Sequence, residues 1–78
     1  MTHNLLIAGY YGFGNTGDEA ILTALLAELR ALRPDLDFTV VCDDAEGTAR
    51  RYNVAAVYWK DLPAVLAAAE RADLILLG

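Results

Sequence analysis

The chain has almost none of the residues that form disulfide bonds or zinc sites in small proteins. Its 78 residues include one cysteine, Cys42, and one histidine, His3, which excludes an internal disulfide and a Cys/His zinc site. No apolar run approaches the roughly 18 residues of a transmembrane helix. The first residues also lack the basic segment of a secretory signal. We therefore expect a cytoplasmic protein without a membrane span, held together by packing alone.

Basic residues are scarce as well. Six Lys and Arg stand against eleven Asp and Glu, for a net charge of −5. Proteins that bind nucleic acids or anionic membranes need a basic surface to meet phosphates. The charge balance therefore argues against both kinds of partner.

Apolar residues, in contrast, are abundant. They make up 56% of the chain, above the usual 45–50%, which excludes a disordered segment. A chain of this length buries only about 60% of the surface that it exposes when unfolded. We therefore expect apolar surface to remain and the isolated chain to self-associate.

Four short apolar runs divide the sequence, at residues 5–8, 38–42, 54–59 and 74–77. None alternates with polar residues, which indicates strands covered on both faces, as in a parallel sheet.

Helical patterns separate these runs. The first begins near Thr16, with Glu19 at the spacing of a capping box, and ends before Pro34. Its expected inward positions are Leu22, Leu25, Leu26, Leu29 and Leu32.

A second, short helix is expected at residues 46–52 and a third at 61–72, with Pro63 in its first turn. The inward positions expected in the third helix are Leu62, Val65, Leu66 and Ala69.

This alternation predicts an α/β fold, a three-layer Rossmann-like half with a four-stranded parallel sheet of order 3-2-1-4. Residues 1–78 are then the N-terminal part of a Rossmann-like domain, because strand 74–77 has a bare edge and no following helix. Ligands of such sheets bind beyond the carboxyl ends of the strands where the strand order reverses, here between the first and fourth strands.

The loop at residues 9–19 carries the most information. Gly12, Gly14 and Gly17 match the dinucleotide-binding spacing G-x-G-x-x-G, and Asp43 or Asp44 could contact a ribose. Two carboxylates at residues 18–19, in the first turn of the helix, would however repel a pyrophosphate bound there.

Several residues of the loop could have either a structural or a binding role. Tyr10, Tyr11 and Phe13 could pack over the end of the sheet or line a pocket for a sugar, and Asn15 could simply adopt a left-handed turn conformation. Glu19 could act only as the capping partner of Thr16.

Residues 9–22, Gly-Tyr-Tyr-Gly-Phe-Gly-Asn-Thr-Gly-Asp-Glu-Ala-Ile-Leu, resemble the N-terminal signature of bacterial polysaccharide pyruvyl transferases of the S-layer-anchoring type. Residues 32–35, 48–52 and 71–74 fit the same pattern, so the resemblance covers nearly the whole chain.

The resemblance implies a transferase of cell-wall biogenesis that moves the enolpyruvyl unit of phosphoenolpyruvate onto a glycan sugar as a ketal. It implies a GT-B-like protein of two Rossmann-like domains whose donor-binding residues lie outside these 78 residues. The acceptor is a cell-wall glycan or its lipid-linked precursor, the donor substrate is phosphoenolpyruvate, and no cofactor or metal is expected. The chain alone is then expected to be inactive.

Carried over residue by residue, the acidic position of the family motif falls on Asp18, the expected catalytic carboxylate. A carboxylate can deliver or remove the protons that ketal formation requires. The expected substrate-binding residues are Tyr10, Tyr11, Gly12, Phe13, Gly14, Asn15, Thr16, Gly17 and Glu19.

Two other classes of function stay open. One is a non-catalytic Rossmann-like module that binds a sugar or a nucleotide. The other is an assembly element that pairs through the bare edge of strand 74–77. His3, Lys60 and the pair Arg50–Arg51 are interpreted as surface residues rather than ligands.

Overall fold

The computed structural model describes residues 3–11 and 16–77, and strands alternate with helices throughout. The elements are β1 (His3–Tyr11), α1 (Thr16–Leu32), β2 (Leu36–Cys42), α2 (Ala45–Tyr52), β3 (Ala55–Tyr58), α3 (Leu62–Arg71) and β4 (Leu74–Leu77).

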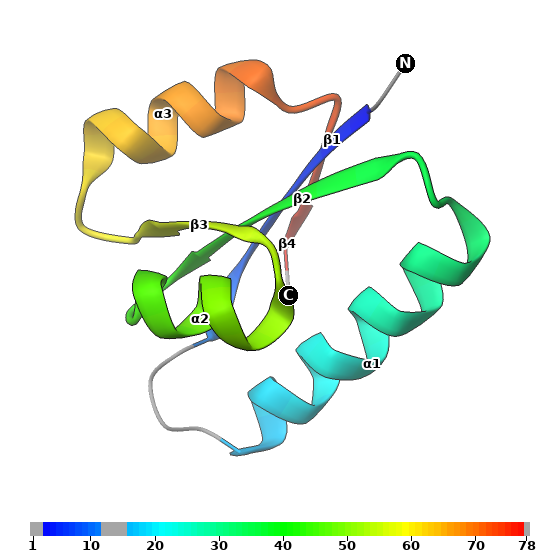
Figure 1. Ribbon diagram of the computed structural model, residues 1–78. Helices are drawn as coiled ribbons and strands as arrows, with labels where there is room; N and C mark the ends of the chain where they lie inside the picture. The colour runs from blue at the N-terminus through cyan, green and yellow to red at the C-terminus, as the bar shows by residue number, and fades with distance from the viewer. Residues whose placement is uncertain (1–2, 12–15, 78) are drawn as a thin grey trace.

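The four strands form one parallel sheet of order β3-β2-β1-β4, which confirms the predicted α/β class and strand order. Figure 1 shows three layers, with α3 on one side of the sheet and α1 and α2 on the other. This is the arrangement of a Rossmann-like half-domain, and the strand order reverses between β1 and β4.

Each face of the sheet has its own apolar cluster. Side chains of β1 and β2 alternate between the two, so that Ile7 and Val40 face α1 while Leu6 and Val41 face α3. The larger cluster consists of Leu5, Ile7, Leu22, Leu26, Phe38, Val40 and Cys42. The smaller one consists of Leu6, Val41 and Ala68, with Val65 and Ala69 packed against it.

Three inward positions predicted from helical spacing are wrong. Leu32 is 75% exposed at the end of α1, and Leu62 and Leu66 are 64% and 62% exposed on α3. The buried residue of α3 is Ala68 instead, because this helix lies against the sheet through its small residues and turns its leucines to one flank.

The strand ends also differ from prediction. β1 continues past Gly9 to Tyr11, because after an irregularity between Ala8 and Tyr11 the strand pairs again with β2 at Cys42. β2 begins at Leu36, two residues before the apolar run at 38–42. The sequence pattern missed this start because Asp37 is polar.

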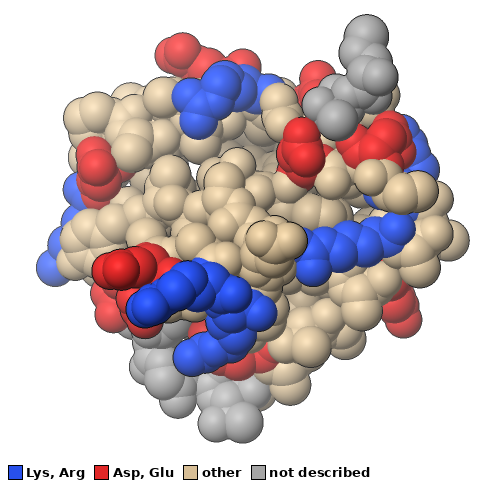
Figure 2. All heavy atoms as spheres, in the orientation of Figure 1, with Lys and Arg blue, Asp and Glu red and all other residues tan. Residues whose placement is uncertain are grey.

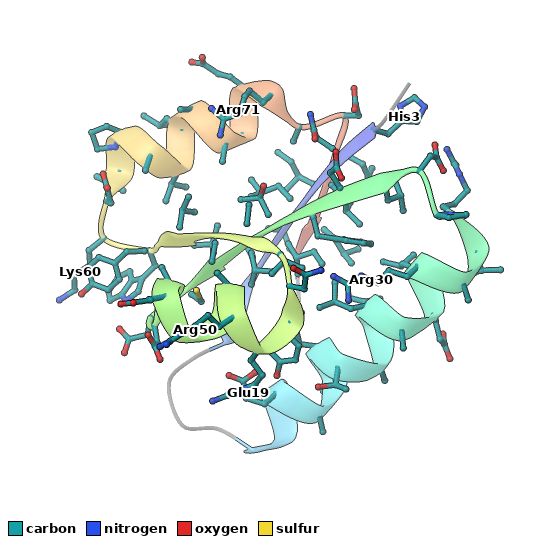
Figure 3. The ribbon with its side chains drawn as sticks, in the orientation of Figure 1. His3, Glu19, Arg30, Arg50, Lys60 and Arg71 are labelled. Atoms are coloured by element: carbon teal, nitrogen blue, oxygen red, sulfur yellow. The ribbon has the colours of Figure 1, made fainter. Side chains whose placement is uncertain are left out.

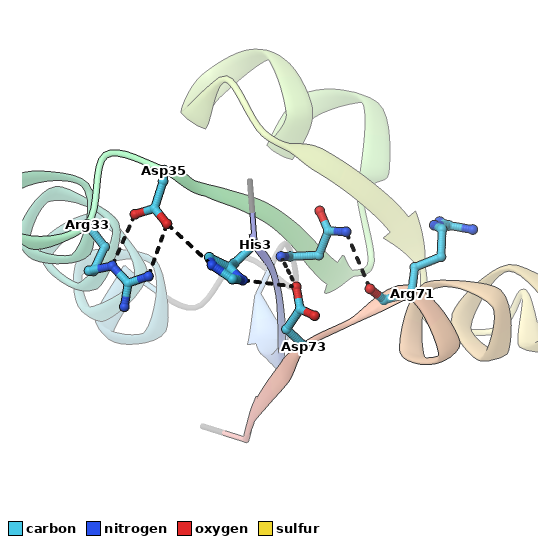
Figure 4. Close-up of polar contacts among 6 residues, drawn as sticks. His3, Arg33, Asp35, Arg71 and Asp73 are labelled. Atoms are coloured by element: carbon cyan, nitrogen blue, oxygen red, sulfur yellow. Dashed lines mark hydrogen bonds and ion pairs between the residues drawn. The ribbon is translucent and has the colours of Figure 1, made fainter. Parts of the chain in front are cut away.

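Polar contacts join the amino ends of the central strands (Figure 4). His3 lies 3.7 Å from Asp35 and 3.8 Å from Asp73, at the start of β2 and β4 respectively. The Arg33 guanidinium binds both oxygens of Asp35 at 3.0 Å and lowers the pKa of that carboxyl. His3 therefore helps to fix the strand starts, at the edge opposite the glycine-rich loop.

Candidate functional site

The candidate site lies at the carboxyl edge of the sheet. β1 ends there at Tyr11 and α1 begins at Thr16, so residues 12–15 connect them at the point where the strand order reverses. Of the predicted site residues, Gly12, Phe13, Gly14 and Asn15 lie outside the described residues. The side chains of Tyr10, Tyr11, Thr16 and Asp18 also lie outside the described part.

Asp18 and Gly17 belong to the first turn of α1. The amino end of a parallel-sheet crossover helix adjoins the carboxyl ends of the strands, so the main chain of Asp18 stands at the edge where a ligand would bind. That the Asp18 carboxylate meets a ligand there stays a prediction.

Glu19 is the predicted site residue whose contacts are best defined. Its Oε2 accepts a hydrogen bond of 2.6 Å from the Tyr52 hydroxyl, and its Oε1 lies 3.8 Å from Nη1 of Arg51. The Glu19 side chain is only 17% exposed. Glu19 thus joins the first turn of α1 to the last turn of α2, which a capping role alone does not require.

Further contacts strengthen this junction. The Thr23 hydroxyl donates to the Glu19 carbonyl at 2.9 Å, and the Tyr52 hydroxyl lies 3.4 Å from the same carbonyl. Arg30, in the last turn of α1, donates to the carbonyls of Tyr52 and Asn53 at 2.7 and 3.0 Å. Both ends of α1 are therefore joined to the end of α2, the first turn through Glu19 and the last turn through Arg30.

Sequence reasoning missed Tyr52 because its partner Glu19 lies 33 positions away. The only available signal was its place at the end of a short helix, directly after Arg51.

Replacing Tyr52 by phenylalanine should destabilise the protein by roughly 1.5–3 kcal/mol, the usual contribution of a hydrogen bond to a charged group. The Glu19 carboxylate would keep its position in a largely buried setting but lose a short donor. Urea unfolding followed by circular dichroism measures the loss.

Tyr58→Phe is the matched control, because Tyr58 is 40% exposed and its hydroxyl makes no hydrogen bond to a described residue. Equal unfolding midpoints for Tyr52→Phe and the unsubstituted chain would show that the Glu19–Tyr52 contact contributes nothing to stability.

The two carboxylates considered for a ribose are both engaged within the chain. Asp44 accepts a hydrogen bond from the Gly47 amide at 3.0 Å and caps α2. Asp43 accepts a hydrogen bond from the Trp59 indole at 3.1 Å. Each carboxylate has further acceptor positions, so these contacts do not exclude a ribose. The objection to a dinucleotide is the repulsion of its pyrophosphate by the two carboxylates at residues 18–19.

Basic residues gather beside this edge. Figure 2 shows blue side chains over α2, whose last turn contains Arg50 and Arg51, with red acidic side chains next to them. In Figure 3, Glu19, Arg50 and Lys60 lie toward the carboxyl edge and His3 at the opposite end. Arg51 was interpreted from sequence as a solvated residue; it is 62% exposed but lies beside Glu19.

The described residues show little that could bind a metal. Within residues 3–11 and 16–77, no group of three or more His, Cys, Asp or Glu side chains is placed to hold an ion. Cys42 is fully buried with its Sγ 3.8 Å from the Val57 carbonyl. Burial raises the pKa of this thiol, which keeps it neutral and unreactive near neutral pH.

A groove of about 700 Å³ lies at the opposite, amino edge of the sheet. Arg30 and Arg71 line it together with Asn4, Asp37 and Asn53. Arg30 is occupied there by two carbonyls and by the face of Phe38, 5.5 Å from the ring centroid. The groove therefore lies between helix ends at the amino edge, whereas sheets of this kind bind their ligands at the carboxyl edge.

Comparisons of the chain with protein-family models, curated proteins and solved structures gave no match. The fold is thus given by the structure itself, and the resemblance to pyruvyl transferases depends on the quoted sequence segments alone. In the part of the chain that the structure describes, none of the helices has the length and apolar character needed to cross a membrane.

Proposed function

We propose that the chain is the N-terminal portion of a polysaccharide pyruvyl transferase. The observation that carries the proposal is the segment of glycines and aromatic residues at 9–19, which runs from the carboxyl end of β1, at the reversal of strand order, into the first turn of α1. It leads into a helix whose first turn contains Asp18 and Glu19. The donor is phosphoenolpyruvate, and the acceptor is a sugar of a cell-wall glycan or of its lipid-linked precursor, modified in the cytoplasm.

The reaction gives the carboxylate a defined task. Two sugar hydroxyls lose their protons as their oxygens form bonds to the central carbon of the enolpyruvyl unit, and the bond from that carbon to the phosphate oxygen breaks. One of the two protons goes to the methylene carbon and the other leaves with the phosphate. Asp18 transfers one of these protons. Because Glu19 is bound to Tyr52, the first turn that contains Asp18 is held in place before substrate arrives.

Deleting the gene in the source cells tests this proposal without assuming that the 78 residues act alone. We expect ketal-linked pyruvate, measured by mild acid release from purified cell-wall glycan, to disappear and to return with the reintroduced gene. Unchanged pyruvate in the deletion strain would refute the proposed reaction. The purified 78-residue chain is expected to release no phosphate from phosphoenolpyruvate with glycan present.

Strand β4 favours a second candidate, self-association. Its side chains Leu74, Ile75 and Leu77 are 63%, 48% and 78% exposed, and in the described sheet β4 pairs only with β1. The free edge of such a strand can pair with the same strand of a second copy.

Leu77→Lys should then weaken self-association at least tenfold, because two like charges would meet near the paired edges. Sedimentation velocity over a hundredfold range of concentration measures the change. Leu32→Lys is the control, since Leu32 is 75% exposed at the end of α1. A monomer at every concentration without any substitution would remove this candidate.

A further inference from the structure

An exposed aromatic pair stands at the carboxyl edge, outside the site residues considered so far. Tyr58 ends β3 and Trp59 follows it, with 40% and 41% of their surfaces exposed. The Trp59 amide donates to the Cys42 carbonyl at 3.0 Å, which extends the pairing of β2 and β3 by one residue. The backbone of Trp59 is thus fixed by the sheet rather than by a loose connection.

The indole ring is held in place as well. Its Nε1 donates to Oδ1 of Asp43 at 3.1 Å, directly after β2. The Tyr58 ring lies 6.3 Å from it in an edge-on arrangement, and Nζ of Lys60 lies 5.1 Å from its centroid. We call Asp43, Tyr58, Trp59 and Lys60 the aromatic platform.

The chemistry of the platform fits a sugar ring. One face of a pyranose consists of C–H groups that pack against an aromatic ring, while its rim carries hydroxyl groups. The Asp43 carboxylate at the edge of the indole accepts hydrogen bonds, and the Lys60 ammonium, which lies over one face of the indole, donates them. A sugar packed against the ring can therefore make both kinds of hydroxyl contact.

A nucleotide fits the platform less well. Bases also stack on aromatic side chains, but a nucleotide brings phosphates. Asp43 and Asp44 stand together at this end of β2 and would repel these phosphates, whereas Arg50, Arg51 and Lys60 on the same edge would attract them. A neutral ring depends on neither effect, and the sugar titration below tests it directly.

The platform lies on the same edge as the glycine-rich loop. Cys42 pairs with Tyr11 of β1 on one side and with Tyr58 of β3 on the other. Two strand spacings of roughly 4.8 Å therefore put the platform on the order of 10 Å from the end of β1. A glycan of several rings can span that distance.

We propose that the aromatic platform binds one sugar ring of the acceptor glycan, beside the ring that receives the pyruvyl group. The identity of the ligand as the acceptor rests on the proposed function; the binding of a sugar ring does not.

Trp59 is the only tryptophan in the chain, so its fluorescence reports directly on the platform. We would titrate the protein with methyl glycosides of glucose, galactose, N-acetylglucosamine and N-acetylmannosamine, and with the β1,4-linked trimer of N-acetylglucosamine. At least one is expected to give a saturable change in the millimolar range, tighter for a trimer than for its monomer. No saturable change with any of these sugars would overturn the platform.

Asp43→Ala should weaken the observed binding at least fivefold, because it removes both the anchor of the indole and a hydroxyl acceptor. Trp59→Ala should abolish the saturation-transfer NMR signals of the sugar. Leu32→Ala, at an exposed leucine of α1, is the matched control and should change neither. Circular dichroism verifies that each variant is folded.

The outcomes separate this inference from the proposed function. Sugar binding that depends on Trp59, combined with unchanged pyruvate in the deletion strain, would keep the platform and refute pyruvyl transfer. Sugar binding that persists in Trp59→Ala would overturn the platform whatever the deletion strain shows.

Discussion

Cells in which Asp18→Asn replaces the natural protein are expected to form ketal-linked pyruvate 10²- to 10⁴-fold more slowly, the usual contribution of a general acid or base. Asparagine has nearly the same shape but cannot give up or take up the proton that the reaction moves. The rate of pyruvate incorporation into cell-wall glycan, normalised to the amount of protein, measures the effect.

Asp37→Asn is the matched control for charge, because Asp37 is exposed near the start of β2, at the opposite edge of the sheet. It should leave the rate within about twofold. Equal rates for Asp18→Asn and Asp37→Asn would exclude Asp18 as the proton-transferring group, even if deletion of the gene had confirmed the reaction itself.

The largest expected effect on folding belongs to Leu22, whose side chain has no exposed surface. It packs from α1 into the cluster that contains Ile7 and Val40. Leu22→Ala should cost roughly 2–5 kcal/mol through lost burial and the cavity left behind. A domain of this size has a total stability of only about 4–12 kcal/mol, so the variant should lose a large share of it and melt roughly 8–40 °C below the unsubstituted chain.

Thermal unfolding followed by circular dichroism measures this loss, with Leu32→Ala as the control. Both residues were predicted from the sequence to face inward, yet Leu32 is 75% exposed. Leu32→Ala should therefore shift the melting temperature by no more than a few degrees. Similar losses for the two variants would contradict the burial pattern of α1.

The structure describes only part of the predicted pyruvyl transferase site. Asp18 and Gly17 fall in the first turn of α1, as the capping-box spacing of Thr16 and Glu19 indicated. Glu19 was expected to cap its own helix or touch substrate, and both stay predictions; the bond of its carboxylate to Tyr52 from the next helix was not predicted. Local spacing describes contacts within one turn, and it carries no information about which distant helix will lie alongside.

The same limit explains the aromatic platform. Trp59 looked like the end of an apolar strand in the sequence, because tryptophan is common in strands. Its exposure and its bond to Asp43, 16 positions earlier, arise only when β2 and β3 end at the same edge.

The order of elements and the parallel sheet were determined by the sequence alone. An uninterrupted apolar run such as residues 38–42 is typical of a strand covered on both faces in a parallel sheet, and the right-handed connections between such strands leave few topologies. The burial of Leu22 and Leu26 followed from helical periodicity in the same way.

What only the tertiary structure decided is how far each helix covers the sheet. α3 approaches the sheet through Ala68 and Ala69, so Leu62 and Leu66 on its flank stay exposed although their spacing matches an inward face. Periodicity gives the direction of a side chain around its own helix. Whether a strand covers the side chain in that direction depends on how the helix is positioned over the sheet, and only the tertiary packing determines that position.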